Sequence, residues 1–367
     1  MNASSGAPPG DHAAVGDLVV SVDSGKYSRL DLPVTVVFDS GELNGVDPIG
    51  LLEVDSAGDP IAPETPWQFD GRDGGGGTLV FMLTGTTAAE TVRRYRIRLG
   101  STGPVHGAVE APLQVDDEVS HQSQASIRVA SAGRTWYYHK HGAGFASLYD
   151  RDENDWISYR PEGGASGNYR GVPNLVYPEG YFHPGGMKCE TRLIASGPLC
   201  ARIESTAEDG AWAVRWEIYP RHARLTVLRA PKPFWVLYEG TPGGRLDTES
   251  DRVVRSTGET TPASEPWTGP LPDLAWAGFV DGASGRMLYL CRHETYDGLT
   301  DSYWPMQEAM TVFGFGRNKL EHFHTRTPAR FTVGLIESEE RDAAGDLICG
   351  AVRDPEVSVD PEPSEAG

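Results

Sequence analysis

The sequence has few of the residues and segments that mark metal-binding, redox, membrane or nucleic-acid-binding proteins. It has four cysteines in 367 residues, Cys189, Cys200, Cys291 and Cys349, and no two are spaced as CxxC. This absence argues against a zinc knuckle or a dithiol redox motif. Four buried thiols in a cytoplasmic protein are the simplest interpretation, while a Cys189–Cys200 bridge across a hairpin stays open for an exported chain.

Long apolar runs and a targeting segment are also absent. No run approaches the roughly 18 apolar residues of a membrane-spanning helix, so a membrane partner is not expected. The opening MNASSGAPPGDHAAVGD has neither a basic start nor an apolar h-region. We therefore predict no signal peptide and a cytoplasmic location, with export left open if the chain was trimmed.

Basic charge is scarce, because 32 Lys and Arg face 52 Asp and Glu and leave a net charge of −20. A protein that binds nucleic acid needs a basic surface, so this partner is excluded. The acidity is uneven: residues 1–130 carry −10, residues 131–240 carry +1 and residues 241–367 carry −11. Charges more than about 8–10 Å apart are largely screened at physiological salt. An acidic sugar bound at the neutral centre therefore stays compatible with the total charge.

Helical periodicity is scarce as well, with one weak candidate at 302–310. The 44 glycines and 27 prolines instead separate short β-branched runs such as LPVTVVFD, GTLVFMLTG and ARFTVGLIES. This pattern is typical of strands joined by turns. The sequence predicts an all-β fold, a large antiparallel two-sheet β-sandwich whose concave face can hold an extended ligand.

The chain is predicted to divide into four regions. Residues 1–14 are a disordered leader rich in Ala, Ser, Gly and Pro, and residues 15–125 form an N-terminal β-sandwich region. Residues 126–353 form the main sandwich with the ligand groove. Residues 354–367 are an acidic, proline-bearing tail that we expect to be disordered.

Familiar catalytic motifs are missing. The chain has no GxSxG elbow, P-loop or GxGxxG, which disfavours a serine hydrolase and nucleotide binding. Residues 136–186 stand out instead, because they are dense in aromatic, amide, Arg, His and Gly residues and poor in aliphatic ones. Long glycine-bearing loops of this kind are typical of binding sites, and a loop packed by its own side chains is the plain alternative.

Three short clusters add candidates. Glu239 follows an apolar strand and precedes a glycine turn, where a carboxylate is either a structural anchor or a catalytic acid or base. The segment TDSYWP supplies Tyr303 and Trp304. The segment RNKLEHFHTRTP supplies His322 and His324.

Two HxH pairs, His139/His141 and His322/His324, raise the question of a metal. Alternate residues of a strand face the same way, so two such pairs on neighbouring strands could hold an ion such as zinc together with a carboxylate. No cofactor is required by the sequence. A divalent metal on His322 and His324 is a weak further expectation.

Two reactions on a glycan would use these residues. β-Elimination from a uronate needs a base for the C5 proton, a group that neutralises the carboxylate, and an acid for the leaving oxygen. Hydrolysis needs two carboxylates about 5–5.5 Å or 6.5–9.5 Å apart, for which Asp155, Glu239 and Asp301 are candidates. The candidate catalytic residues are Tyr169, His183, Glu239 and Tyr303. The candidate substrate-binding residues are His139, His141, Asp155, Asn168, Arg170, Arg221, His222 and Trp304.

The order of the motifs FASLYDRDENDWISY, SGNYRGVPNLVYP, YFHPGG, WEIYPRHARLTVL, YEGTPGG and DSYWPM resembles a family of bacterial β-proteins. That family is associated with carbohydrate breakdown and with galactose-mutarotase-like β-supersandwich enzymes, which include polysaccharide lyases and glycosidases. The resemblance covers most of residues 17–340. It implies a supersandwich and a sugar ligand, and a His–Glu pair in the concave sheet, which His183 or His222 could form with Glu239.

We therefore expect a carbohydrate-active enzyme that cleaves glycosidic bonds in oligosaccharides or polysaccharides. A lyase acting on uronate-containing glycans is the leading form. A glycoside hydrolase with a carboxylate pair and a non-catalytic sugar-binding protein are the alternatives. The expected partner is the glycan, and a homo-oligomer stays open.

Overall fold

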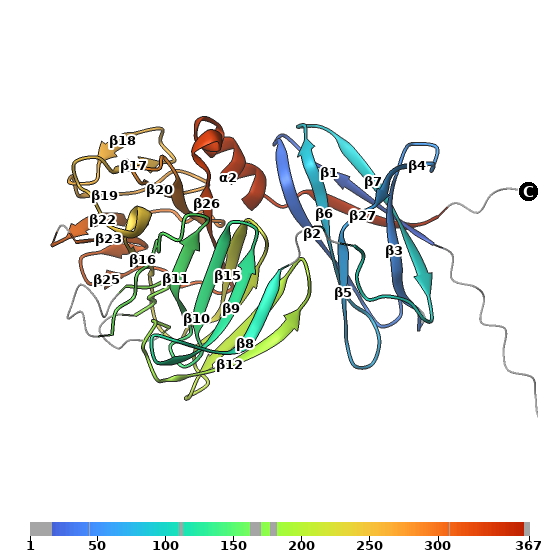
Figure 1. Cartoon of the computed structure of the whole chain (residues 1–367), viewed down its shortest axis with the longest axis horizontal. Coiled ribbons are helices and arrows are strands. Elements are labelled where there is room, and N and C mark those ends of the chain that lie inside the picture. The colour runs from blue at the N-terminus through green and yellow to red at the C-terminus, as the bar shows by residue number, and fades with distance from the viewer. Residues whose placement is uncertain are drawn as a thin grey trace, which may run out of the picture.

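The computed structural model describes residues 17–43, 45–108, 110, 113–161, 170–176, 182–307 and 309–362. These residues form antiparallel strands almost throughout, gathered into a smaller and a larger sandwich that lie side by side (Figure 1). The α-helix among them is α2 (Ala344–Val352). No helix of the described residues is long and apolar enough to cross a membrane. The predicted all-β sandwich is confirmed.

The smaller sandwich packs a five-stranded sheet, β27-β1-β7-β3-β4, against a three-stranded sheet, β2-β6-β5. Its strands are β1 (Leu18–Asp23), β2 (Arg29–Phe38), β3 (Asp47–Val54), β4 (Pro60–Glu64), β5 (Trp67–Gly71), β6 (Gly77–Thr87), β7 (Val92–Gly100) and β27 (Glu356–Pro361). Alternate residues such as Val20, Val22, Tyr95 and Ile97 fill its core, because successive side chains of a strand point to opposite faces.

Two boundary predictions need correction. The tail predicted to be disordered from residue 354 contains β27, whose residues pair with all six residues of β1. This strand satisfies the free edge of β1 and places Val357 against the small core. The predicted boundary between residues 125 and 126 falls inside β9 (Gln124–Ser131), whose sheet belongs to the larger sandwich.

The larger sandwich has a back sheet of nine strands in the order β12-β13-β14-β15-β26-β21-β20-β17-β18. These strands are β12 (Cys189–Ser196), β13 (Ala201–Ala207), β14 (Ala213–Ile218), β15 (His222–Arg229), β17 (Arg252–Arg255), β18 (Thr260–Pro262), β20 (Trp276–Val280), β21 (Met287–Arg292) and β26 (Ala329–Ile336).

The front sheet of the larger sandwich consists of two four-stranded halves, β11-β10-β9-β8 and β16-β23-β22-β19. Its strands, besides β9, are β8 (Gln114–His121), β10 (Arg134–His139), β11 (Gly144–Asp150), β16 (Val236–Gly240), β19 (Trp267–Gly269), β22 (Asp301–Met306) and β23 (Met310–Phe315). Residues 171 and 172 join the halves, because Val172 bridges Phe145 of β11 and Gly171 bridges Glu239 of β16.

One core fills the space between the front and back sheets. Trp136, Tyr138, Phe145 and Tyr238 of the front sheet contribute to it, as does Trp216 of the back sheet. The side chains that alternate with them on the front strands therefore point away from the back sheet. We call this the outer face of the front sheet. The remaining short elements are η1 (Pro242–Gly244), β24 (Arg317–Asn318), β25 (Glu321–His322) and η2 (Ser338–Ala343).

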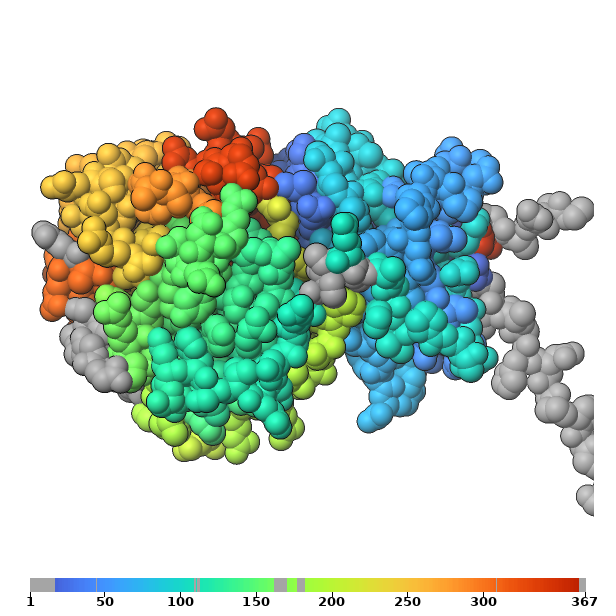
Figure 2. Space-filling model, viewed as in Figure 1, coloured from blue at the N-terminus to red at the C-terminus, as the bar shows by residue number. Residues whose placement is uncertain are grey.

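The two sandwiches meet through a polar and apolar seam that is visible in the space-filling view (Figure 2). Gln68 of β5 accepts hydrogen bonds from the backbone of Leu199 and Cys200, at 2.9 and 2.8 Å, and donates one to the Cys200 carbonyl. The buried guanidinium of Arg29 donates to carbonyls at the end of α2, including that of Gly350 at 2.6 Å. Figure 2 shows that the teal and green strands of the front sheet are left uncovered by the smaller sandwich.

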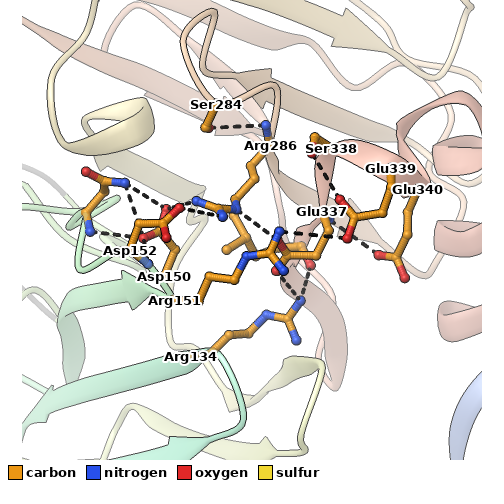
Figure 3. A network of polar contacts seen from close by, with 12 residues as sticks. Arg134, Asp150, Arg151, Asp152, Ser284, Arg286, Glu337, Ser338, Glu339 and Glu340 are labelled. Carbon is orange, nitrogen blue, oxygen red and sulfur yellow. Dashed lines mark hydrogen bonds and ion pairs between the residues drawn. The ribbon is translucent and has the colours of Figure 1, made fainter.

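A network centred on Arg286 fastens the front sheet to the back sheet (Figure 3). Its guanidinium, 4% exposed, contacts Asp150 at 3.0 Å, Asp152 at 2.6 Å and Glu337 at 2.8 Å. Glu337 also faces Arg134 at 3.7 Å. Asp150 and Arg134 belong to the front sheet, whereas Arg286 and Glu337 come from the back sheet side. The network therefore joins the front sheet to the back sheet at the end of β11.

Replacing Arg286 with Met should lower the free energy of unfolding by about 3–5 kcal/mol, because Asp150 would be left buried without its counter-charge. Urea denaturation followed by tryptophan fluorescence measures the change. The matched control is Arg215→Met, whose pair with Glu204 lies at the surface and should contribute at most about 1 kcal/mol. Equal losses in the two variants would contradict the role given to Arg286.

Candidate functional site

Glu239 lies on the outer face of the front sheet. In β16 the side chains of Val236 and Tyr238 enter the core, so the alternation of the strand turns Glu239 the other way. Its residue is only 5% exposed. The backbone of Glu239 exchanges hydrogen bonds with Gly171, at 2.7 and 3.0 Å, and pairs with Val312 on its other side.

Two side chains contact the Glu239 carboxylate. His183 Nε2 lies 3.4 Å from Oε2, and Asn174 Nδ2 donates a hydrogen bond of 3.2 Å to the same oxygen. Asn174 is 1% exposed, and its Oδ1 has no hydrogen-bond partner among the described residues. A carboxylate held by an amide and facing an imidazole can orient the ring and stabilise its protonated form.

Glycines bring His183 to this position. A Cβ added at Gly171 would lie 2.4 Å from Pro184 Cδ, and one added at Gly144 would lie 2.7 Å from the same atom. The segment that carries His183 and Pro184 therefore lies directly on the outer face, where any side chain at these two positions would lift it away. The short contact at Gly171 is also next to the strand bridge to Glu239.

The buried ring of His139, at the end of β10, supports the segment that carries His183 and Pro184. His139 is 0% exposed, and its Nδ1 accepts a hydrogen bond of 3.2 Å from the Gly185 amide. Burial, followed by the nearby charges of His121 and His183, lowers the pKa of His139 to about 3. His139 is therefore neutral at physiological pH and holds the segment as an acceptor, which is a positioning role.

Arg170 and Asp155 also serve the architecture around the site. Arg170 donates through its terminal nitrogens to the carbonyls of Ser158 and Ala309, both at 3.2 Å, and burial lowers its pKa. Asp155 Oδ1 accepts the backbone amides of Leu148 and Ile157 at 3.1 and 3.0 Å. Both side chains were predicted to bind substrate, and the structure shows them holding the loops beside Glu239.

Trp304 shares the outer face with Glu239. It is 55% exposed and pairs with Val312, which in turn pairs with Glu239. Because neighbouring strands are about 4.8 Å apart, two strand spacings place the indole about 10 Å from Glu239. This exposed ring provides a flat apolar surface of the kind that a sugar ring can stack on.

Of the residues predicted as catalytic, Tyr303 is not joined with Glu239. Tyr303 lies on the core face of β22, is 1% exposed and donates a hydrogen bond of 2.6 Å to the Ala263 carbonyl. Its neighbour Trp304 points to the opposite face because successive strand residues alternate. The same alternation buries Asp301, which pairs with Arg292 at 2.9 Å. Tyr169 lies outside the described residues, as does Asn168.

Three predicted binding residues also lie apart from the pair. His222 begins β15 in the back sheet, pairs with Gly334 and is 2% exposed. Arg221 precedes it and forms an ion pair with Glu340 at 2.7 Å. His141 is exposed in the turn after β10. The back-sheet placement rules out His222 as the partner of Glu239 and leaves His183 in that position.

The two histidines predicted to bind a metal, His322 and His324, pack against aromatic rings. His322 lies 3.8 Å from the Trp235 ring, centroid to centroid. His324 is 0% exposed, stacks on Phe234 and meets Tyr296 edge-on. Within the part of the chain that the structure describes, no three His, Cys, Asp or Glu residues are grouped to hold an ion.

Arg317 and Asn174 were not among the residues predicted from the sequence. Arg317 packs over the Trp235 ring at 5.4 Å. Burial lowers its pKa, and the charge of Glu239 opposes that shift, so the guanidinium lies within electrostatic reach of the carboxylate. A run of Arg, Asn and Lys after a strand was the only sequence signal for Arg317, and Asn174 was one of several amides in a polar segment.

No model of a known protein family matches the chain, and no curated protein matches its sequence. Among solved structures, an α-mannosidase from Enterococcus faecalis is similar with a TM-score of 0.51 and 11% identity. The similarity covers 94% of this chain and 46% of that one, so this chain spans less than half of the mannosidase's length. At this identity the likeness shows a shared fold.

Two further solved structures were matched at lower similarity. The protein HI1317 gives a TM-score of 0.44 at 12% identity, over 63% of this chain and 98% of that one. A YidC insertase gives 0.35 at 10% identity, over 64% of this chain and 43% of that one. At such scores neither likeness bears on the function of this chain.

Replacing Gly171 with Ala should displace the segment that carries His183, because the new methyl group would collide with Pro184. We expect the Gly185 and Gly186 amides, which bond to His139 and His183, to lose hydrogen-exchange protection. Gly269→Ala is the matched control, since a Cβ there meets nothing within 4 Å. Unchanged protection in the Gly171 variant would show that the contact is not needed.

The buried His324 predicts a loss of stability in acid. Burial lowers its folded-state pKa to about 3, against about 6.5 when unfolded. As pH falls from 6.5 towards 3, the unfolded chain takes up a proton that the folded chain does not, and stability falls by up to about 1.4 kcal/mol per pH unit. His324→Phe removes this titrating group, so stability should fall less steeply with pH, by up to the contribution of one bound proton. Denaturation at several pH values measures it, and an unchanged slope would contradict the assignment.

Proposed function

We propose that this protein is a carbohydrate-active enzyme that cleaves glycosidic bonds in uronate-containing glycans by β-elimination. The observation that supports the proposal most is the pairing of His183 with Glu239 at 3.4 Å on the outer face of the front sheet. The exposed Trp304 on the same face adds a surface for a sugar ring. The fold shared with a mannosidase is compatible with a sugar substrate.

In the proposed reaction His183 removes the C5 proton of the uronate. The electron pair forms the C4–C5 double bond, the C4–O bond breaks, and the leaving oxygen takes up a proton from water, after which His183 releases the C5 proton to solvent. Glu239 orients the His183 ring and stabilises its positive charge once the proton has been taken up. Asn174 and Arg317, which border Glu239, are the described groups best placed to oppose the charge of the uronate carboxylate.

Elimination suits the described carboxylates better than hydrolysis. Hydrolysis requires two carboxyl groups on either side of the glycosidic bond. Of the three carboxylates considered from the sequence, Asp301 is buried in an ion pair and Asp155 is engaged by backbone amides. Glu239 alone among those three faces His183, and elimination needs no second carboxylate.

A glycoside hydrolase is the second candidate. The similarity in fold to an α-mannosidase, which is a glycoside hydrolase, favours it. In that case Glu239 would act with Asp155, whose carbonyl accepts a hydrogen bond from Thr241, two residues after Glu239. A protein that binds sugar without cleaving it is the third candidate.

His183→Asn and Glu239→Gln should each reduce kcat on uronate glycans by about 10²–10⁴-fold, the usual contribution of a positioned acid or base. Formation of the unsaturated uronate is followed by its ultraviolet absorbance, and reducing ends are counted in parallel. Glu340→Gln is the matched control, because this carboxylate pairs with Arg221 away from the site and its loss should leave kcat unchanged.

Three results would contradict the lyase. Reducing ends released from neutral glycans without unsaturated product would identify a hydrolase. Saturable glycan binding without any product would identify a binding protein. Full activity of the Glu239 variant would remove the residue on which both enzymatic forms depend.

A further inference from the structure

A hollow lies on the outer face of the front sheet, over β9, β10 and β11. It has a volume of about 590 Å³ and is lined by Arg128, Thr135, Tyr137 and Tyr149, with Arg134 and Arg151 beside them. Two carboxylates also line it, Asp150, which is paired with Arg286, and the exposed Glu153. We call it the Tyr137 cavity. Tyr137, Tyr149 and Arg151 lie in the polar segment 136–186, but none of the lining residues was named as a site candidate, and none is used by the proposed reaction.

The floor of the cavity is set by strand register. Arg128 of β9 pairs with Tyr137 of β10, and Thr135 pairs with Tyr149 of β11. Trp136 and Tyr138 fill the core from the same strand, so alternation leaves Tyr137 on the outer face. The two tyrosines and Arg128 are half-buried, and the tyrosine rings meet edge to face with centroids 5.9 Å apart.

Ring contacts connect the lining of the cavity to the segment that carries His183. The Tyr137 ring stacks on His121 at 4.0 Å between centroids, and His121 lies 6.0 Å from His139. His139 in turn accepts the Gly185 amide beside His183. A row of rings therefore leads along the outer face from the cavity to the His183–Glu239 pair.

Arg128 is the available positive charge in the cavity. It pairs in the strand register with Asp116 of β8, and the described residues show no ion pair within 4 Å between the two side chains. The other two arginines of the lining face Glu337, Arg134 at 3.7 Å and Arg151 at 3.3 Å (Figure 3). A guanidinium next to aromatic rings matches a sugar unit that combines an apolar ring face with an anionic group.

We propose that the Tyr137 cavity is an accessory subsite that binds an anionic sugar unit of the same glycan, through Arg128 and the faces of Tyr137 and Tyr149. This inference rests on the proposed function, because it takes the glycan as the ligand of the outer face. It makes the substrate a chain long enough to reach from the His183–Glu239 pair to β9. The anionic group is a carboxylate or a sulfate ester, and both are met by the same guanidinium chemistry.

The test measures binding to the full-length Glu239→Gln protein by calorimetry, so that no turnover is needed. The probes are oligogalacturonate, which carries only carboxylates, dextran sulfate, which carries only sulfates, and unmodified dextran. We expect an anionic probe to bind more tightly than dextran. Adding Arg128→Gln should weaken that binding about tenfold or more, as for the loss of a hydrogen-bonded ion pair. The preferred probe identifies the anionic group.

Arg215→Gln is the matched control, since it removes a half-exposed arginine from the back sheet and should leave all affinities unchanged. Equal affinity with and without Arg128, equal affinity for dextran and the anionic probes, or no binding of any probe would overturn the subsite. A protein that binds through Arg128 but forms no unsaturated product would refute the lyase and keep the subsite. A lyase unaffected by Arg128→Gln would keep the lyase and refute the subsite.

Discussion

Two backbone hydrogen bonds between Gly171 and Glu239, of 2.7 and 3.0 Å, join the halves of the front sheet. No strand of β11-β10-β9-β8 pairs directly with a strand of β16-β23-β22-β19 among the described residues. Residues 171 and 172 bridge the two halves. This bridge fixes which face Glu239 presents. The same Gly171 leaves the room that Pro184 needs, so a single position sets both the carboxylate and the imidazole of the candidate site.

The site inherits its rigidity from the sandwich beneath it. Tyr238, next to Glu239, is completely buried and donates a hydrogen bond of 2.6 Å to the Trp156 carbonyl. Arg286 holds the end of β11, in the same front sheet, against the back sheet through Asp150 and Glu337. Catalytic groups on strands are held more firmly than groups on loops, and Glu239 has this advantage, whereas His183 depends on the glycine contacts.

Much of the fold could be predicted from the sequence, because turn residues and alternating strands are local signals. The alternation in VLYEG is enough to place Glu239 and Tyr238 on opposite faces. The same rule applied to DSYWPM would have separated Tyr303 from Trp304, and the prediction that both served the site overlooked it. In the weak helix candidate at 302–310, residues 302–306 belong to β22 and Met310 begins β23, so the described part is strand and not helix.

Other parts of the fold and of the candidate site could not be predicted from the local sequence pattern. Gly171 and Glu239 are 68 positions apart, and no periodicity in the sequence indicates that they pair. The sequence therefore could not show that His183, and not His222, lies against Glu239. The pairing of β27 with β1 joins the two ends of the described chain, and a short acidic strand of this kind looks like a tail in sequence. Asn174, Arg317 and Arg128 acquire their surroundings only through such long-range contacts.

The account depends on a sugar lying over the His183–Glu239 pair, and one measurement tests this directly. A crystal structure of the Glu239→Gln protein with a bound uronate oligosaccharide would locate the ligand. We predict a uronate ring with its C5 against His183 and the chain running along the outer face towards Tyr137. A ligand bound at the seam between the two sandwiches, or on the back sheet, would contradict the account.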